Sequence, residues 1–351
     1  MDAEGYFLIS GDEPLVKRSL DLGSLEDQEV LVEVGACGVC HTDLSFASGA
    51  VTPRHDLPLV LGHEIMGTVV RSGSEMEDLL DRPVLVPAVL PCGECEYCRA
   101  GRTNICPRQK MPGNDIHGGF ATHVVVPGRF LVPLDDAPDT LRLEELAVVA
   151  DAVSTAYQAV RRSGLSQGDL AVVVGAGGVG GFTLQIAKAL GARTLACDID
   201  PGRLEEALGA DQSLDLSELD AREARRRLRT SMAESAVSPL RHRIFECSGS
   251  GPGQILAFGL LGPAATLVQV GYTREKVELR WSNLMAFDAT VYGSWGCPPG
   301  LYPEVLELIY GGEVEVTPFV EHTGLGDLND VLEDMANHRL RRRLVLHPGA
   351  A

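Results

Sequence analysis

Two patterns of hydrophobic and polar positions divide the chain. Residues 1–150 contain short β-branched runs separated by Gly and Pro, which is typical of a mostly β region. The runs are EVLVEVGACG (29–38), MGTVVRSG (66–73), RPVLVPAVL (82–90) and FATHVVVPGRFL (120–131). From Leu143 onward, apolar segments instead alternate between the spacing of helices and that of buried strands. Such alternation predicts parallel βαβ units.

The second pattern starts with helical spacing over 143–164. Expected strands then alternate with helix-like segments, and the strands are DLAVVV (169–174), RTLACDID (193–200), HRIFECSG (242–249) and ATLVQVGY (265–272). The charge run AREARRRLR (221–229) predicts a solvated helix face. The C-terminal part predicts helix, strand, helix and strand. We therefore expect a two-domain α/β protein, with a β-rich domain formed by 1–150 and 297–351 and a doubly wound parallel-sheet domain at 151–296.

The net charge and the hydropathy of the chain limit the kinds of partner that we expect. The net charge of −19 opposes binding to a phosphate backbone, so we expect no nucleic-acid partner. No run approaches the ~18 apolar residues of a membrane helix, and the acidic start MDAEGYFLISGDEP is no basic-then-apolar leader. We therefore expect a cytoplasmic protein without a membrane partner. In that compartment clustered cysteines bind metal or react more often than they form disulfides.

Four of the nine cysteines lie within one short segment, PCGECEYCRAGRTNIC (91–106). The spacing C-x2-C-x2-C-x7-C lets four thiolates converge on one zinc ion. Disulfides, separate free thiols and an iron–sulfur site are the alternatives. With every position filled by protein, such a zinc site is structural and leaves no place for substrate. Its ligands would be Cys92, Cys95, Cys98 and Cys106.

A second candidate metal site draws on separate segments. GACGVCHTDLSF (35–46) supplies Cys40, and LGHEIMGTV (61–69) supplies His63 and Glu64. A thiolate, an imidazole and one further ligand make the three-protein-ligand arrangement of a catalytic zinc, with the fourth position open. Taken singly, Cys40 could equally be a small buried residue and His63 a loop histidine.

The motifs CGVCHTDL, PLVLGHEIMGTV and the four-cysteine segment, in that order, resemble the zinc-dependent medium-chain alcohol dehydrogenase family over nearly the whole chain. The resemblance implies a GroES-like catalytic domain beside a Rossmann domain, with two zinc ions per chain. It implies Cys40 and His63 as catalytic zinc ligands and places Asp151 where the family usually has a cysteine. A carboxylate is also a sound zinc ligand. The alternative is that Asp151 caps a helix and that Glu64, otherwise a nearby acid, completes the zinc site.

The same resemblance implies further roles near the zinc. Thr42 matches the hydroxyl that bonds the substrate oxygen and starts proton release. Many relatives have a histidine three residues further on, and this chain has Ser45 there. His41 and Thr155 match contacts to the pyrophosphate and the nicotinamide of the cofactor.

A glycine fingerprint follows the strand at 169–174 and precedes a helix. VVVGAGGVGG places Gly175, Gly177 and Gly180, together with Gly178 and Val179, where a helix N-terminus faces a pyrophosphate. Asp198 at the end of the next strand can accept both ribose hydroxyls and repels a 2′-phosphate, so we expect NAD. Asp200 is the less favoured acid. The resemblance adds four contacts to the cofactor: Arg203 at the adenosine ribose, which leaves room for NADP, Val270 and Gly271 at the nicotinamide amide, and Arg343 at the pyrophosphate. Arg343 could instead be a charge flanking a strand.

A narrower resemblance concerns the substrate. PAVLPCGECEYCRAGRTNICPRQKMPGN, GGFATHV and LMAFDATVYGSWGC resemble a subgroup of the family that oxidises a ring hydroxyl of a coenzyme A thioester. Arg54, Arg108 and Lys110 are the nearest candidates for CoA phosphates. The alternatives are another secondary or cyclic alcohol or ketone, and a non-catalytic NAD-binding zinc protein. The family implies a homodimer or homotetramer.

Overall fold

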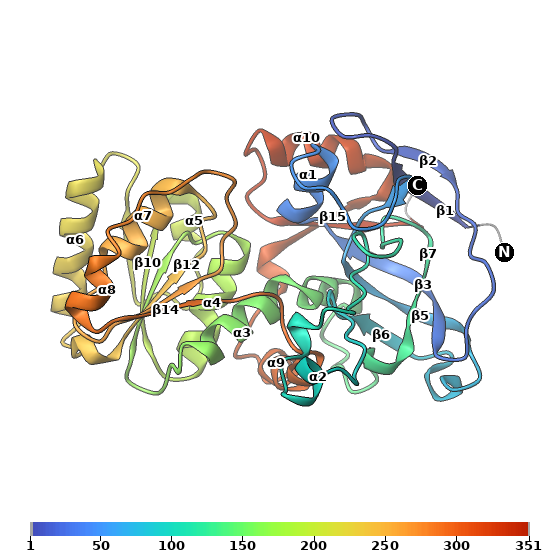
Figure 1. Ribbon diagram of the computed structural model, residues 1–351, viewed down its shortest axis with the longest axis horizontal. Coiled ribbons are helices and arrows are strands. Elements are labelled where there is room, and N and C mark those ends of the chain that lie inside the picture. The colour runs from blue at the N-terminus through green and yellow to red at the C-terminus, as the bar shows by residue number, and fades with distance from the viewer. Residues whose placement is uncertain (1–2, 350–351) are drawn as a thin grey trace. The chain divides into compact units, whose positions relative to one another are not determined.

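The computed structural model describes residues 3–349, which fall into two compact units (Figure 1). Unit 1 comprises 3–154, Gly296–Leu306 and 316–349, and unit 2 comprises Thr155–Trp295 and Glu307–Glu315. Two of the four boundaries between the units fall within helices, namely α3 (Ala152–Arg162) and α9 (Tyr302–Tyr310). Among the described residues, no helix is long and apolar enough to span a bilayer.

Unit 1 is built on a seven-stranded sheet. In spatial order its strands are β15 (Val320–Gly324), β16 (Arg343–His347), β3 (Glu29–Gly38), β5 (Glu64–Ser72), β6 (Pro83–Val86) and β8 (Val132–Pro133), and β7 (His123–Pro127) also pairs with β3. A smaller sheet has the order β2 (Val16–Ser19), β1 (Glu4–Leu8) and β4 (Leu59–Val60). The short helices are α1 (His41–Ala47), α2 (Glu96–Arg99) and α10 (Leu328–Ala336).

The register of β3 and β5 brings distant residues to one end of the sheet. These two strands are antiparallel, and Gly38 at the end of β3 lies opposite Glu64 at the start of β5. The residues that follow β3 and those that precede β5 therefore lie at the same end. Val30, Leu31 and Val32 of β3 are fully buried, so both faces of the strand are covered and its register is strongly specified.

Unit 2 has a six-stranded, wholly parallel sheet. Its strands are β11 (Gln212–Asp215), β10 (Arg193–Asp198), β9 (Leu170–Val174), β12 (His242–Glu246), β13 (Thr266–Gln269) and β14 (Thr290–Gly293), in spatial order. The chain order reverses between β9 and β12, which is the switch point of a doubly wound sheet. All five residues of β9 are buried, as a central parallel strand requires.

Helices cover both faces of the sheet in unit 2. They are α4 (Gly178–Ala189), α5 (Pro201–Glu205), α6 (Ala221–Glu234), α7 (Gly251–Gly259) and α8 (Ser282–Phe287). Residues of α6 and α7 share one core cluster with alternate residues of the strands, while Figure 1 shows α4 on the other side of the sheet. The arginines of the charge run are exposed, whereas Ala224, Leu228 and Met232 form the buried face of α6.

The fold class expected from the sequence is confirmed: a GroES-like β-rich unit and a parallel Rossmann-type sheet. The helical spacing over 143–164 corresponds to two helical segments, a 3₁₀ segment at Leu143–Ala150 and α3, which begins at Ala152. Asp151 lies between the two with φ −135° and ψ −64°, outside both helices.

Candidate metal centre

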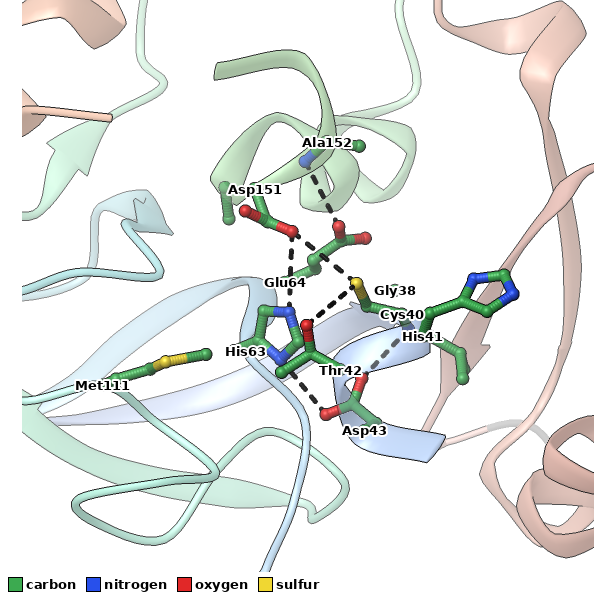
Figure 2. Close-up of polar contacts among 12 residues, drawn as sticks. Gly38, Cys40, His41, Thr42, Asp43, His63, Glu64, Met111, Asp151 and Ala152 are labelled. Carbon is green, nitrogen blue, oxygen red and sulfur yellow. Dashed lines mark hydrogen bonds and ion pairs between the residues drawn. The ribbon is translucent and has the colours of Figure 1, made fainter. Parts of the chain in front are cut away.

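Three segments of unit 1 bring a thiol, an imidazole and two carboxyl groups together (Figure 2). Cys40 precedes α1, His63 and Glu64 lie at the start of β5, and Asp151 lies between the 3₁₀ segment and α3. One donor atom from each of the four residues lies within 4.8 Å of every other. The β3–β5 register accounts for the nearness of Cys40 to His63, and the break before α3 adds the second carboxylate.

The distances fit a zinc ion. Asp151 Oδ2 lies 3.7 Å from Cys40 Sγ and 3.6 Å from His63 Nε2. Two donors on one tetrahedral zinc, with bonds of about 2.0–2.3 Å, are roughly 3.3–3.8 Å apart. His63 Nε2 and Glu64 Oε2 are buried and have no hydrogen-bond partner among the described residues. Leaving such a buried atom unpaired costs about 1–3 kcal/mol, a cost that a bound cation would remove.

Asp43, which was not among the site residues expected from the sequence, orients the imidazole. Its Oδ1 lies 3.1 Å from His63 Nδ1 and accepts the Gly62 N–H at 3.1 Å, while Oδ2 accepts the Cys40 N–H at 3.0 Å. Asp43 is fully buried. A carboxylate on Nδ1 fixes the tautomer that offers Nε2 to a metal. The signal was present in CHTD, where an acid three residues after a helix-capping position can bond the cap's N–H.

Burial and charge set the protonation of the two residues at the start of β5. Burial alone would lower the pKa of His63, but the Asp43 carboxylate, together with Asp151 and Cys40, raises that pKa well above its usual value. Burial raises the pKa of Glu64 to about 7, although the guanidinium of Arg343 opposes the rise. A metal on His63 Nε2 would take the place of the proton.

Glu64 is held from three sides. Its Oε1 accepts hydrogen bonds from the Arg343 guanidinium at 2.6 Å and from the Ala152 N–H at 3.2 Å. Gly38 leaves room for the other oxygen, since a Cβ there would lie 2.1 Å from Glu64 Oε2. Arg343 was expected at a pyrophosphate. In this structure it forms a partly buried ion pair with Glu64, and the pyrophosphate contact stays a prediction.

Thr42, His41 and Ser45 surround the site in different ways. Thr42 Oγ1 lies 3.7 Å from Cys40 Sγ, so its hydroxyl borders the donor cluster. Figure 2 shows the His41 ring pointing away from the other side chains, and the residue is exposed. Ser45 Oγ donates to the carbonyl of His41 at 2.9 Å.

The four cysteines of the 92–106 segment form a second cluster in unit 1. Four Sγ–Sγ distances are 3.5 Å (Cys95–Cys98), 3.5 Å (Cys92–Cys106), 3.7 Å (Cys95–Cys106) and 3.9 Å (Cys92–Cys98). Thiolates on one zinc, with bonds of about 2.3 Å, are roughly 3.8 Å apart. Backbone N–H groups lower the pKa of Cys92 to about 6, which favours a thiolate. Gly93 makes the turn with φ +79°, where a side chain would be strained and would meet Arg129.

The glycine fingerprint in unit 2 has the expected backbone. Gly175 has φ +91°, and a Cβ on it would lie 2.6 Å from the Ser248 backbone. A Cβ on Gly180 would lie 1.8 Å from the Gly175 carbonyl oxygen. Gly177 is the N-cap of α4, in which Gly178 and Val179 form the first turn. The N–H groups of that turn are the donors that an anion at a helix N-terminus would use.

The two acids at the C-terminal end of β10, Asp198 within the strand and Asp200 after it, have different partners. Asp198 is buried, and its Oδ2 accepts the Ala176 N–H at 2.7 Å, which links the end of β10 to the glycine turn. Asp200 caps α5 by accepting the Gly202 N–H. Arg203 lies 3.9 Å from Asp198 and 3.8 Å from Asp200. Both acids therefore accept backbone N–H groups: Asp198 also accepts the Asp200 N–H at 2.9 Å, whereas Asp200 caps a helix.

The remaining predicted cofactor contacts also lie in unit 2. Val270 and Gly271 follow β13, and both backbone N–H groups donate to the Glu246 carbonyl, at 3.0 and 2.9 Å. The Glu246 carboxylate, which is fully buried, accepts from Gln269 Nε2 at 2.6 Å. Thr155 lies in α3, at the start of unit 2.

Comparison with known proteins agrees with this chemistry. Residues 26–136 match the alcohol dehydrogenase GroES-like domain, and residues 178–310 match the zinc-binding dehydrogenase family. An alcohol dehydrogenase of Geobacillus stearothermophilus is 31% identical over 333 residues, 94% of each chain. The structure of the alcohol dehydrogenase from Aeropyrum pernix has a TM-score of 0.86 at 28% identity, over 98% of this chain and 100% of that one.

A solved structure from Sinorhizobium meliloti 1021, bound to NADP, has a TM-score of 0.85 at 25% identity and covers 99% of this chain and 100% of its own. Taken together with the two donor clusters, these similarities show that the chain belongs to the zinc-dependent medium-chain alcohol dehydrogenases, a family of oxidoreductases. The non-catalytic alternative is not supported.

Proposed function

We propose that this protein transfers a hydride between a secondary alcohol and NAD at a zinc ion held by Cys40, His63 and Asp151. The observation that carries the proposal is the convergence of these three donors, with His63 Nε2 buried and without a hydrogen bond among the described residues. When bound, the zinc would polarise the substrate oxygen and lower the pKa of the alcohol. The nicotinamide would accept the hydride.

Asp151 is our choice for the third ligand over Glu64. Glu64 Oε1 already accepts from the α3 backbone and from Arg343, so helix capping falls to Glu64. Asp151 Oδ2 lies at tetrahedral spacing from both other donors. We assign Glu64 the part of a neighbouring acid that can take a vacated position on the metal. Arg343 then holds Glu64 and balances its charge.

Thr42 is the residue we assign to the substrate hydroxyl proton, because its own hydroxyl borders the donor cluster. Ser45 donates to a backbone carbonyl and has no titration near neutrality, so it does not replace a histidine at the outer end of a proton path.

The dinucleotide would bind in unit 2 at the glycine turn, with Asp198 on the ribose hydroxyls. NAD is favoured because Asp198 is a buried acid at the end of β10, where a 2′-phosphate would meet its charge. The nearby Arg203 and the NADP-bound relative support testing both dinucleotides.

For the substrate we propose the ring alcohol 6-hydroxycyclohex-1-ene-1-carbonyl-CoA of anaerobic benzoyl-CoA degradation, oxidised to the 6-oxo product. This finer assignment rests on the resemblance of the KMPGN region and neighbouring segments. Two of the candidate phosphate-binding cations already have partners: Arg54 lies 3.3 Å from Asp115, and Arg108 lies 2.9 Å from Glu94. These pairs favour a second candidate substrate, a cyclic or secondary alcohol without CoA.

Two further proposals concern assembly and location. β14 is an edge strand of the sheet in unit 2, and the nearby Tyr292 and Trp295 are 38% and 53% exposed. An edge strand with exposed aromatic residues supports pairing of two chains in a homodimer or homotetramer. We also propose a cytoplasmic location, because the free thiols of the two clusters need a reducing compartment.

The test of the activity is reduction of NAD, with NADP in parallel, by the CoA thioester, by free cyclohexenols and by simple secondary alcohols. We expect kcat/KM for the thioester with NAD to exceed that of free alcohols by at least ~10-fold, or ~1.4 kcal/mol of transition-state stabilisation. Equal turnover of free alcohols would contradict the CoA assignment alone. Failure of every alcohol with protein that holds two zinc ions would contradict the reaction.

A further inference from the structure

Asp151 lies between two helical segments, so neither helix fixes its backbone conformation. The 3₁₀ segment ends at Ala150 and α3 begins at Ala152, so neither helix sets the φ and ψ of Asp151. A metal ligand at such a position has the right orientation only if neighbouring residues hold its backbone in place. Glu64 holds one side of it, by accepting the Ala152 N–H (Figure 2).

Tyr302 and Ser154 hold the other side. The Tyr302 hydroxyl donates to the carbonyl oxygen of Ala150 at 2.5 Å, and Ser154 Oγ lies 3.2 Å from that hydroxyl and 3.2 Å from the Asp151 carbonyl oxygen. Both side chains are buried, with exposures of 1% and 0%, so water does not compete for these bonds. The Ala88 N–H also donates to Ala150, at 3.2 Å.

We infer that Tyr302 is a positioning residue for the catalytic zinc: through Ala150 and Ser154 its hydroxyl holds the Asp151 backbone so that Oδ2 faces Cys40 and His63. This inference rests on the proposed role of Asp151. Tyr302 lies in the return segment Gly296–Leu306, far from Asp151 in sequence, and belongs to the same unit. A hydroxyl that acts only through the ligand's backbone should affect the affinity of the open site and leave the four-cysteine site unchanged.

The test compares zinc binding by the full-length enzyme and three variants, by competition with a chromophoric chelator. Tyr302→Phe removes one hydroxyl and keeps the ring. We expect it to lower the affinity for one of the two zinc ions by about 10–100-fold, the range found when a group that orients a metal ligand is removed. The other zinc should bind as in the wild type, and excess zinc should restore most of kcat. Cobalt(II) in the open site should show shifted visible bands, because its ligand geometry changes.

Ser154→Ala removes a hydroxyl of the same network and should lower the affinity for the same zinc ion. It replaces Tyr302→Phe in the test if that variant does not fold. Ser163→Ala is the matched control. Ser163 is also a buried serine, just after α3, and its hydroxyl bonds only Val160 and Leu165 among the described residues. It should bind both zinc ions normally.

The inference is overturned if Tyr302→Phe and Ser154→Ala bind both zinc ions as tightly as the wild type, or if both sites weaken together. A wild type that binds only the four-cysteine zinc would instead overturn the proposed function itself.

Discussion

The two donor clusters of unit 1 differ in how the chain assembles them. The four-cysteine cluster comes from one segment, 92–106. The other cluster takes Cys40 from just after β3, His63 from just before β5 and Asp151 from the residue before α3. In the first cluster every donor is a thiol from the same short segment. In the second, the donors differ and their spacing depends on strand register. A cluster whose donors come from one segment can fill every coordination position of its metal, whereas a cluster assembled from separate segments can leave one position open.

The partners around the two clusters differ as well. Backbone N–H groups of the turn itself support Cys92 and Cys95. His63 and Glu64 instead depend on charged side chains from elsewhere in unit 1, Asp43 and Arg343 respectively. The open site therefore needs the surrounding fold, and the closed site needs little beyond its own segment. Replacing a cysteine by alanine should therefore lower activity at the open site and stability at the closed site.

The largest expected effect is on activity at the open site. Cys40→Ala removes a catalytic ligand, and the loss of several kcal/mol of charge stabilisation should lower kcat/KM on the order of 10³-fold. Steady-state kinetics with saturating zinc measure it. Activity within a few-fold of the wild type would remove Cys40 from the site.

Cys95→Ala makes the matched change at the closed site, and there we expect a loss of stability. The zinc would no longer bind the folded state, which costs about 4 kcal/mol where free zinc exceeds the dissociation constant about 1,000-fold. Denaturant unfolding with zinc present measures this loss. The folded fraction should keep wild-type kcat. If kcat fell while the free energy of unfolding stayed the same, the structural role would be contradicted.

Asp43→Asn should have a smaller effect, confined to the open site. The amide keeps the shape but loses the charge that fixes the His63 tautomer. We expect zinc affinity at the open site to fall about 10–100-fold. Chelator competition measures the change, and the four-cysteine zinc is the internal control. Equal weakening of both zinc ions would mean that Asp43 acts on the fold as a whole.

Local features of the sequence predicted much of the fold and part of the site. The glycine fingerprint and the four-cysteine segment are recognisable because each acts within a few residues, where spacing alone determines which groups can meet. The alternation of strands and helices likewise indicated the parallel sheet, since its four central strands, β10, β9, β12 and β13, are buried along most of their length.

The remaining features depend on contacts between distant residues. No spacing rule pairs Arg343 with Glu64, or makes Gly38 the space that Glu64 Oε2 occupies. Asp43 resembles an ordinary acid in the first turn of a helix until the register of β3 and β5 places His63 beside it. The break at Asp151 was hidden because the residues on both sides have helical spacing.

The most direct measurement is the zinc content of fully active enzyme, combined with anomalous diffraction at the zinc edge. We predict two ions per chain, one among the four cysteines and one within bonding distance of Cys40, His63 and Asp151. Fully active protein with a single ion, surrounded only by thiolates, would contradict it.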